Sequence, residues 1–325
     1  MTRERGDARV AAMSNAFRKP PRAEHRAPRR YTLAGRQFDV AGLAPGLHIV
    51  ATPIGNLGDI TLRALEALAG ADLIACEDTR VTRKLLDSYV IATPLTPYHE
   101  HNATKARPLL LRRLAEGAAI TLVSDAGTPL ISDPGFKLVR AAKEAGHAVT
   151  ALPGASAPLA ALAVAGLPTD QFLFAGFLPS KQAARRARIA ELSRIPATLV
   201  LFEAAPRIAA TLADLAAGLG QEREAALCRE LTKLHEEIRR GDLKTLAQSC
   251  AANEPRGEIV LVIAPPQAPQ RASEGETEAL LRAALNRVSL KDAVGEVADA
   301  TGLPRRDVYQ RALTLAKDPK HGAPR

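Results

Sequence analysis

Aromatic residues are scarce in this chain of 325 residues, because Phe, Trp and Tyr together make up 3% of it and tryptophan is absent. The interior must therefore be built mainly from Ala, Leu, Val and Ile, which an apolar content of 46% allows. Few rings can stack on nucleic-acid bases, and Tyr98 and Phe177 are the best-placed candidates.

Long apolar runs and paired cysteines are also missing. No apolar stretch reaches the roughly 18 residues that indicate a membrane span, so we expect no membrane partner. Cys76, Cys228 and Cys250 lie far apart and form no CxxC pair, which argues against disulfides and predicts a cytoplasmic protein. His99 and His101 have a spacing that could chelate a metal, but no third ligand is evident, so we expect no metal site.

Two glycine-rich nucleotide motifs are absent. The chain contains neither the G-x-G-x-x-G pattern of dinucleotide-binding folds nor the G-x-x-x-x-G-K-[ST] pattern of P-loops. Hydride transfer with a nicotinamide cofactor and P-loop nucleotide hydrolysis therefore lose their usual support.

Positive charge is present but unevenly placed. The chain carries a formal charge of +9, and residues 1–45 hold ten basic and four acidic side chains. This Pro- and Arg-rich arm has no sustained helical or strand period, which predicts disorder. The arm could add nonspecific affinity for phosphates, or it could be an extension upstream of a start at Met13.

Three segments of similar composition follow short apolar runs, and each combines Gly, Pro and small polar residues. They cover residues 49–58, 123–135 and 151–157. In an open α/β sheet, ligands bind at the carboxyl ends of the strands, where such loops present backbone amides and carbonyls. We therefore expect one pocket with backbone groups from Pro53 to Gly55 and from Gly127 to Ser132, and with the hydroxyls of Thr128, Ser132 and Ser156.

Strand and helix patterns alternate from residue 47 onward, which predicts an α/β fold with a largely parallel sheet. A second series of strands and helices begins near residue 171, and 265–270 has the composition of a linker. Residues 290–313 show a helix, a Gly-containing turn and a second helix, which could bind RNA or pack on the rest of the protein. The predicted division is an arm (1–45), a cofactor domain (46–168), a second α/β domain (169–265) and a helical unit (271–325).

Six motifs, in order and at continuous spacing, resemble those of the tetrapyrrole methylase superfamily. Within it they are similar to the branch that methylates the ribose 2′-hydroxyl of a cytidine in the decoding region of small-subunit ribosomal RNA. The motifs are PIGNLGDITLRALEALAGADLIACEDTR (53–80), YHEHN (98–102), SDAGTPLISDPG (124–135), LPGASAPLAAL (152–162), FAGFLP (174–179) and CRELTKLHEE (228–237).

This resemblance implies two αβα domains of the class III methyltransferase type, a homodimer, and S-adenosylmethionine as cofactor. The cofactor contacts it implies are Asp125, Gly127, Thr128, Ser132, Ser156, Ala157, Leu201 and Phe202. Members that modify tetrapyrroles carry Gly-Asp-Pro in the middle loop, whereas this chain has Gly127-Thr128-Pro129. That difference argues against a tetrapyrrole substrate.

Methyl transfer to a hydroxyl requires positioning and a group that accepts the proton. Candidate acceptors or orienting groups are Asp78, Glu100 and His101, which follow strands at the same expected edge. Asp78 could instead cap a helix or pair with Arg80.

Basic residues near the expected cleft could bind small-subunit ribosomal RNA or a 30S particle through its phosphates, or could simply be solvated. The candidates are Arg80, Lys84, Arg185, Arg186 and Lys233. Two other functions remain open at this point: a methyltransferase for a tetrapyrrole or another small molecule, and a noncatalytic nucleic-acid-binding regulator.

Overall fold

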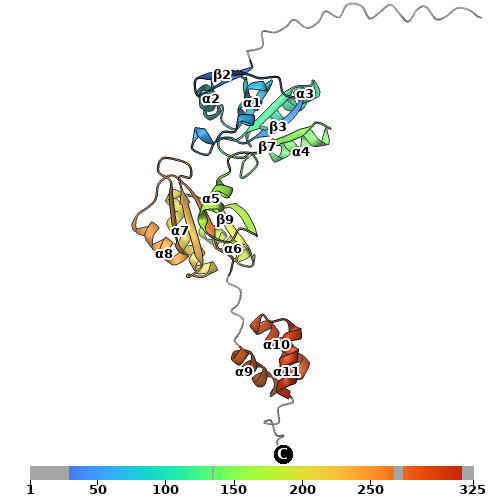
Figure 1. Ribbon diagram of the computed structural model, residues 1–325, viewed down its shortest axis with the longest axis vertical. Helices are drawn as coiled ribbons and strands as arrows, with labels where there is room; N and C mark the ends of the chain where they lie inside the picture. Colours follow the sequence, from blue (N-terminus) through green and yellow to red (C-terminus); the bar gives the residue numbers. More distant parts are fainter. Residues whose placement is uncertain (1–28, 134, 267–273, 317–325) are drawn as a thin grey trace, which may run out of the picture. The chain divides into compact units, whose positions relative to one another are not determined.

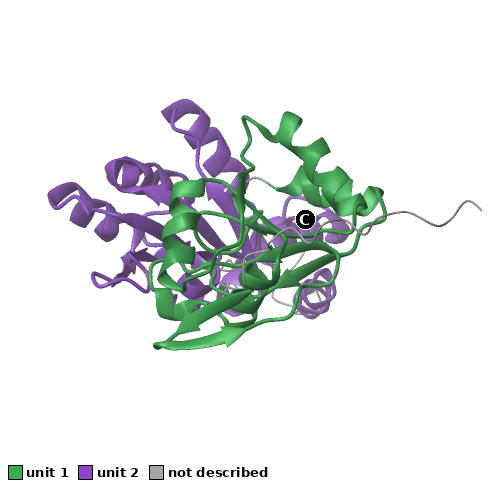
Figure 2. Ribbon diagram, turned by 90° about the horizontal axis from the view of Figure 1, so that it is seen from above, with its two compact units in different colours: residues 1–156 green, residues 157–325 purple. Residues whose placement is uncertain are grey.

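The structure is a computed structural model that describes residues 29–133, 135–266 and 274–316 (Figure 1). The chain divides into two compact units, residues 1–156 and 157–325 (Figure 2). Most of the predicted N-terminal arm and both ends of the predicted C-terminal unit lie outside the described residues.

The first unit contains a five-stranded sheet in the order β5-β4-β6-β3-β7, and every strand pair in it is parallel. All five strands therefore end at the same edge, where the connections to the following helices begin. The strands are β3 (Gly46–Val50), β4 (Leu73–Cys76), β5 (Leu95–Pro97), β6 (Ala119–Val123) and β7 (Val149–Leu152).

Helices cover both faces of this sheet. Side chains of α1 (Leu62–Gly70) and α2 (Thr79–Ser88) pack in one apolar core, which also includes Val50 and Ile74 of the sheet. Side chains of α3 (Ala103–Ala115) and α4 (Phe136–Glu144) pack in the other. A short 3-10 helix, η1 (Leu57–Asp59), precedes α1. Right-handed crossovers require this arrangement, because the chain moves across the sheet in one direction from β3 to β5 and in the opposite direction from β5 to β7.

A β-hairpin precedes the sheet, formed by β1 (Arg30–Leu33) and β2 (Arg36–Asp39). The prediction of disorder is therefore wrong for this part of the arm. Ala34 and Gly35 both have positive φ angles, which suits the tight two-residue turn of a hairpin. Tyr31 is buried in the α1–α2 core, and Arg29 forms an ion pair with Asp72 at 2.6 Å. The hairpin was not predicted because its strands have only four residues each and include charged side chains, so they show no clear apolar alternation.

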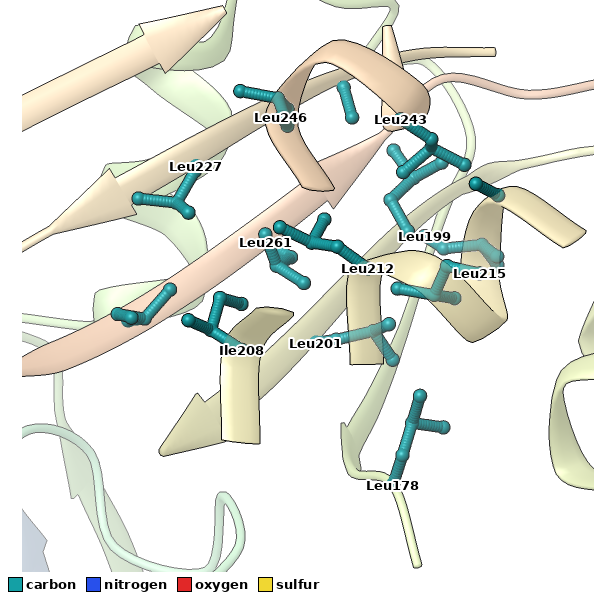
Figure 3. Close-up of a cluster of buried hydrophobic side chains, with 14 of the residues drawn as sticks. Leu178, Leu199, Leu201, Ile208, Leu212, Leu215, Leu227, Leu243, Leu246 and Leu261 are labelled. Carbon is teal, nitrogen blue, oxygen red and sulfur yellow. The ribbon is translucent and has the colours of Figure 1, made fainter. Parts of the chain in front are cut away.

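The second unit contains a sheet in the order β11-β10-β12-β9-β8, in which only β8 and β9 are parallel. Its strands are β8 (Phe172–Phe177), β9 (Thr198–Ala204), β10 (Glu224–Arg229), β11 (Glu237–Asp242) and β12 (Glu258–Ile263). Its helices are α6 (Gln182–Leu192), η2 (Ala205–Arg207), α7 (Ile208–Leu219) and α8 (Leu243–Ala252). Figure 3 shows the leucine-rich core between α7, α8 and the sheet.

Helix α5 (Ala157–Ala165) belongs to this second unit, because it contacts β9, β10, β11 and β12. The side chain of Arg240 in β11 donates hydrogen bonds to the carbonyl oxygens of Val164 and Ala165 at the end of α5. The boundary between the units thus lies before α5, whereas the sequence predicted it after residue 168.

Three helices follow the linker: α9 (Glu274–Leu285), α10 (Leu290–Thr301) and α11 (Arg305–Ala316). Leu281, Val297 and Val308 form a small apolar core between them. The predicted helix-turn-helix pattern corresponds to α10 and α11, and Gly302 at the turn is left-handed. Among the described residues, no helix is long and apolar enough to cross a membrane.

Candidate functional site

The carboxyl edge of the first sheet gathers five connecting segments, including the three loops predicted from the sequence. Two of those loops are joined directly, because Thr52 and Gly127 exchange two backbone hydrogen bonds at 2.9 and 3.0 Å. Gly127 has a φ angle of 78°, and a Cβ atom placed there would lie 3.2 Å from the Cγ2 atom of Ile54. This close approach of the β3 and β6 loops therefore favours glycine at position 127.

The third predicted loop joins the other two. The hydroxyl of Thr128 donates a hydrogen bond to the carbonyl oxygen of Ala155 at 3.1 Å. A Cβ atom at Gly154 would lie 2.9 Å from the Cβ atom of Ala51. The structure thus brings the three loops together at the edge where the sequence predicted a pocket.

The loop after β6 holds an unusual backbone. Leu130 and Ser132 have φ angles of 74° and 66°, a region that residues with a side chain seldom occupy. Such strain persists only where surrounding structure enforces it, and it is concentrated at functional sites. Within the loop, the Ser124 hydroxyl lies 3.2 Å from the carbonyl oxygen of Ala126, to which it donates a hydrogen bond.

Eight predicted cofactor residues belong to the first unit or to its boundary. Asp125, Ser132 and Gly55 are exposed at this edge, Pro53, Thr128 and Ser156 are half-buried, and Gly127 is buried between loops. Ser156 ends the first unit and Ala157 begins α5.

Leu201 and Phe202 lie on β9 of the second unit. Leu201 is 1% exposed and packs among other leucines (Figure 3). That burial contradicts a cofactor contact by its side chain. The ring of Phe202 lies 4.9 Å from that of Phe174 and 5.4 Å from that of Phe177, measured between centroids.

Carboxylates gather at the ends of β4 and β6. The backbone N–H of Asp78 donates a hydrogen bond to Oδ1 of Asp125 at 3.0 Å. Burial raises the pKa of Glu77, and three neighbouring carboxylates raise it further. Burial also raises the pKa of Asp133, against a hydrogen bond with Ser124 that lowers it. Asp133 is not among the site residues predicted from the sequence, although its place near the end of the SDAGTPLISDPG motif could have indicated it.

Asp78 has two structural partners. Its carboxylate accepts the backbone N–H of Arg80 at 2.8 Å, as the N-cap of α2, and pairs with the Arg80 guanidinium at 2.6 Å. The hydrogen bonds with Arg80 lower the pKa of Asp78 to about 2. A carboxylate with so low a pKa is a weak proton acceptor.

The loop between β5 and α3 presents the other two catalytic candidates. Glu100 and His101 are exposed, and the His101 ring lies 6.1 Å from that of His99. Asn102 fixes the loop, because its side chain accepts the N–H of His99 and donates to the carbonyl oxygen of Pro97, both at 2.9 Å. No cluster of three or more His, Cys, Asp or Glu suited to a metal occurs in the described residues.

Tyr98, which begins this loop, is 1% exposed and lies in the α3–α4 core. It cannot stack on a base, so the prediction for Tyr98 is wrong. Its apolar ring fills the core more favourably than it would face solvent.

The predicted RNA contacts differ in availability. The Arg80 side chain is 86% exposed, and Lys84 is exposed on the same helix. Arg185 is buried and binds Asp214 at 2.7 Å, which contradicts a phosphate contact by Arg185. Arg186 shares that carboxylate at 2.8 Å. Lys233 pairs with Glu230 and Glu258 at 2.9 and 2.7 Å.

The sequence matches known families over most of its length. The model of the family Tetrapyrrole (Corrin/Porphyrin) Methylases matches residues 46–247, and that of the RsmI C-terminal HTH domain matches residues 271–316. A relative from Mesorhizobium japonicum, named ribosomal RNA small subunit methyltransferase I, is 50% identical over 84% of this chain and 93% of its own. A relative of the same name from Erythrobacter litoralis is 52% identical over 84% of this chain and 96% of its own.

Solved structures share the fold. The cobalamin biosynthetic enzyme cobalt precorrin-4 methyltransferase aligns with a TM-score of 0.52 and 18% identity, over 67% of this chain and 94% of its own. Diphthine synthase aligns with a TM-score of 0.53 and 17% identity, over 67% and 89%. The predicted α/β class with C-terminal helices is confirmed. The chain belongs to the tetrapyrrole methylase family and, within it, to the ribosomal RNA small subunit methyltransferase I group.

Proposed function

We propose that this chain transfers a methyl group from S-adenosylmethionine to small-subunit ribosomal RNA. The observation that carries the proposal is the match to relatives with that name over 84% of the chain. The match includes the three loops that the structure joins by hydrogen bonds at one sheet edge. The RNA substrate would place the enzyme in the cytoplasm, where ribosomal subunits assemble.

The residues of this edge suit the proposed cofactor. When bound, S-adenosylmethionine supplies a methyl group activated by a positively charged sulfonium. The backbone groups of Gly127 hold the loops together through Thr52, and the residues beside them, Pro53 to Gly55 and Thr128 to Ser132, are the proposed backbone contacts. Glu77 and Asp133 are carboxylates whose raised pKa values reflect burial and repulsion by neighbouring carboxylates, Asp125 in both cases. A cationic ligand would relieve that repulsion.

The finer activity we propose is methylation of the ribose 2′-hydroxyl of a cytidine in the decoding region. The sequence Gly127-Thr128-Pro129 supports this over a tetrapyrrole substrate, and Thr128 is used to hold the loop of Ala155. Among the proposed proton acceptors, Glu100 and His101 are exposed and beside the carboxyl edge. Asp78 is the least suited, because its pairing with Arg80 keeps it ionised.

The proposed partners are the 30S particle or its RNA, and a second copy of the chain. Arg80 and Lys84 on α2 remain the proposed phosphate contacts, since both are exposed. Each substitution of these two residues by Ala should reduce the salt dependence of RNA binding by about one unit.

The deciding experiment measures transfer of labelled methyl groups from S-adenosylmethionine to 30S particles and to purified small-subunit RNA, followed by mass mapping of the product. A 2′-O-methylcytidine in the decoding region is expected. Methylation of a base would contradict the proposed 2′-O position. Methylation of a tetrapyrrole and of no RNA would contradict the whole proposal. Folded protein that binds no S-adenosylmethionine in calorimetry would instead favour a noncatalytic regulator.

The proton acceptor is tested in single-turnover assays with saturating cofactor and RNA. Glu100→Gln or His101→Ala should lower the rate by about a hundredfold with cofactor affinity unchanged. Asp78→Asn should have a smaller effect. Near-native rates for both Glu100→Gln and His101→Ala would show that the proton leaves by another route.

A further inference from the structure

Helices α3 and α4 lie side by side on one face of the first sheet and carry a marked excess of positive charge. No acidic residue occurs within α3, and the one in α4, Glu144, is paired with Arg140 at 2.8 Å. Surfaces of soluble domains usually mix both signs of charge, because like charges repel. The exposed cations of this face are Lys105, Arg112, Arg113, Lys137, Arg140 and Lys143.

Apart from Arg140, these exposed cations have no ion-pair partner among the described residues. Of the residues that the sequence suggested for RNA, four are paired with carboxylates of their own unit: Arg80, Arg185, Arg186 and Lys233. The α3–α4 face therefore presents charge that the fold itself does not neutralise, and its complement is a polyanion.

The placement of two lysines strengthens this reading. Lys105 and Lys137 lie in the first turns of α3 and α4, where the helix dipole disfavours a cation. Residues that oppose a local structural preference, as these lysines oppose the helix dipole, are expected at functional surfaces.

An exposed aromatic residue lies at the same end of the face. Phe136 is the first residue of α4, directly after the loop that follows β6, and it is 66% exposed. Both helices begin at the carboxyl edge of the sheet, next to the candidate site. A strand of RNA that crossed this edge would meet cations and a ring suited to stacking.

We propose that the α3–α4 face is an RNA-binding surface, in which Lys105, Lys137 and the arginines of α3 bind phosphates and Phe136 stacks on a base. This inference rests on the proposed function, because it assigns the route by which the RNA reaches the site.

The proposed phosphate contacts are tested by removing two positive charges from the α3–α4 face and, as a control, two from the β1–β2 hairpin. The double variant Lys105→Gln/Lys137→Gln should lower the slope of log affinity against log salt by one to two units, measured with unmodified small-subunit RNA transcribed in vitro. The matched control is Arg30→Gln/Arg36→Gln, which removes from the hairpin two exposed arginines that form no ion pair with another described residue. The control should keep the native slope, and equal slopes for the two doubles would overturn the proposal.

The stacking part has a different signature. Phe136→Ala should weaken RNA binding about tenfold without changing the salt slope, and Phe136→Tyr should restore it. An unchanged affinity together with a changed oligomeric state in light scattering would place Phe136 in a subunit interface and overturn its role. If the Lys105→Gln/Lys137→Gln double variant lost binding to anionic phospholipid vesicles but kept native RNA binding, the assignment of RNA to this face would be overturned.

Methyl transfer by the unsubstituted protein separates the two proposals. If it methylates the RNA and the Lys105→Gln/Lys137→Gln double variant binds RNA like the control, the surface is wrong and the proposed function stands. If it transfers no methyl group although it binds RNA through this face, the proposed function is wrong and the surface stands.

Discussion

At the scale of single residues, Gly127 is the point where two loops of the candidate site meet. Gly127→Ala would add a Cβ atom 3.2 Å from Ile54 in a left-handed backbone. We expect a loss of about tenfold in S-adenosylmethionine affinity by calorimetry, because the loops must separate. The backbone strain alone should lower stability by about 1 kcal/mol.

A glycine elsewhere in the first unit separates these two effects. Gly146 has the same φ of 78° but open space around its Cβ position. Gly146→Ala should lower stability by a similar amount of about 1 kcal/mol and leave cofactor affinity unchanged. Equal affinity losses in both variants would mean that strain, and not the contact of the loops, governs binding.

Asp133 and Asp78 predict opposite effects of pH on stability. The folded-state pKa of Asp133 is raised by burial, so its ionisation opposes folding once the pH exceeds the unfolded value. Asp133→Asn should therefore raise Tm at pH 7, by a few degrees, and the gain should shrink as the pH falls toward about 4. Thermal unfolding between pH 4 and pH 7 measures this, and a gain that grows at lower pH would contradict it.

The pKa of Asp78 is lowered to about 2, so its stabilising effect is present above the unfolded value and is lost as the pH falls through the folded one. Asp78→Asn should lower Tm at pH 7, which makes it the counterpart of Asp133→Asn. If Asp133 binds the cofactor cation, Asp133→Asn should also weaken cofactor affinity while it stabilises the fold.

At the scale of elements, Asp214 on α7 joins α6 to α7 through two arginines of α6. Its side chain is 3% exposed; burial opposes its ionisation, but hydrogen bonds from Arg186 and Arg185 outweigh this and keep its pKa low. Asp214→Asn would leave the Arg185 charge buried without a counter-charge. We expect a loss of about 3–5 kcal/mol in unfolding free energy, measured with urea.

The exposed pair of Arg188 and Glu191 on α6 provides the comparison. Its side chains are 43% and 65% exposed. Arg188→Gln should lower stability by less than about 1 kcal/mol. A similar loss for Asp214→Asn and Arg188→Gln would show that the buried pair contributes no more than a surface pair.

Elements with a strong local signal were predictable from the sequence. Helix α5 and strand β12 are each an almost continuous apolar run with Gly or Pro close beyond its end, which is a pattern that the sequence alone reveals. Strand β5 has only three residues, and β11 reads Glu-Ile-Arg-Arg-Gly-Asp, so neither shows an apolar pattern. These strands form through their neighbours in the sheet, which the local sequence does not reveal.

The candidate site was predictable at the level of loops and less so at the level of side chains. The Gly- and Pro-rich motifs indicated three loops that the structure joins. The side chains of Arg185 and Tyr98 were wrongly predicted to contact RNA, because both are buried in the folded chain. The local sequence does not reveal this burial. The carboxylate repulsion at Asp133 likewise depends on the approach of Asp125 in space.

At the scale of the whole molecule, cofactor binding should leave a pattern along the chain. In hydrogen exchange with and without S-adenosylhomocysteine, we expect slower exchange in 51–58, 124–133 and 153–156, whose loops form the candidate site. The β1–β2 hairpin serves as an internal reference and should not change. Protection confined to 157–316 would contradict a site on the first sheet, and added protection at β9 would support a contribution by Phe202.

The order of strands in the first sheet also determines when the strands can pair during translation. β3 and β4 do not pair with each other, because β6 lies between them and pairs with both. A ribosome making this chain completes β3 and β4 before it reaches β6, so the nascent chain must carry these apolar strands without their shared neighbour. Translation of the codons between Cys76 and Ala119 therefore fixes the interval during which chaperones have access to them.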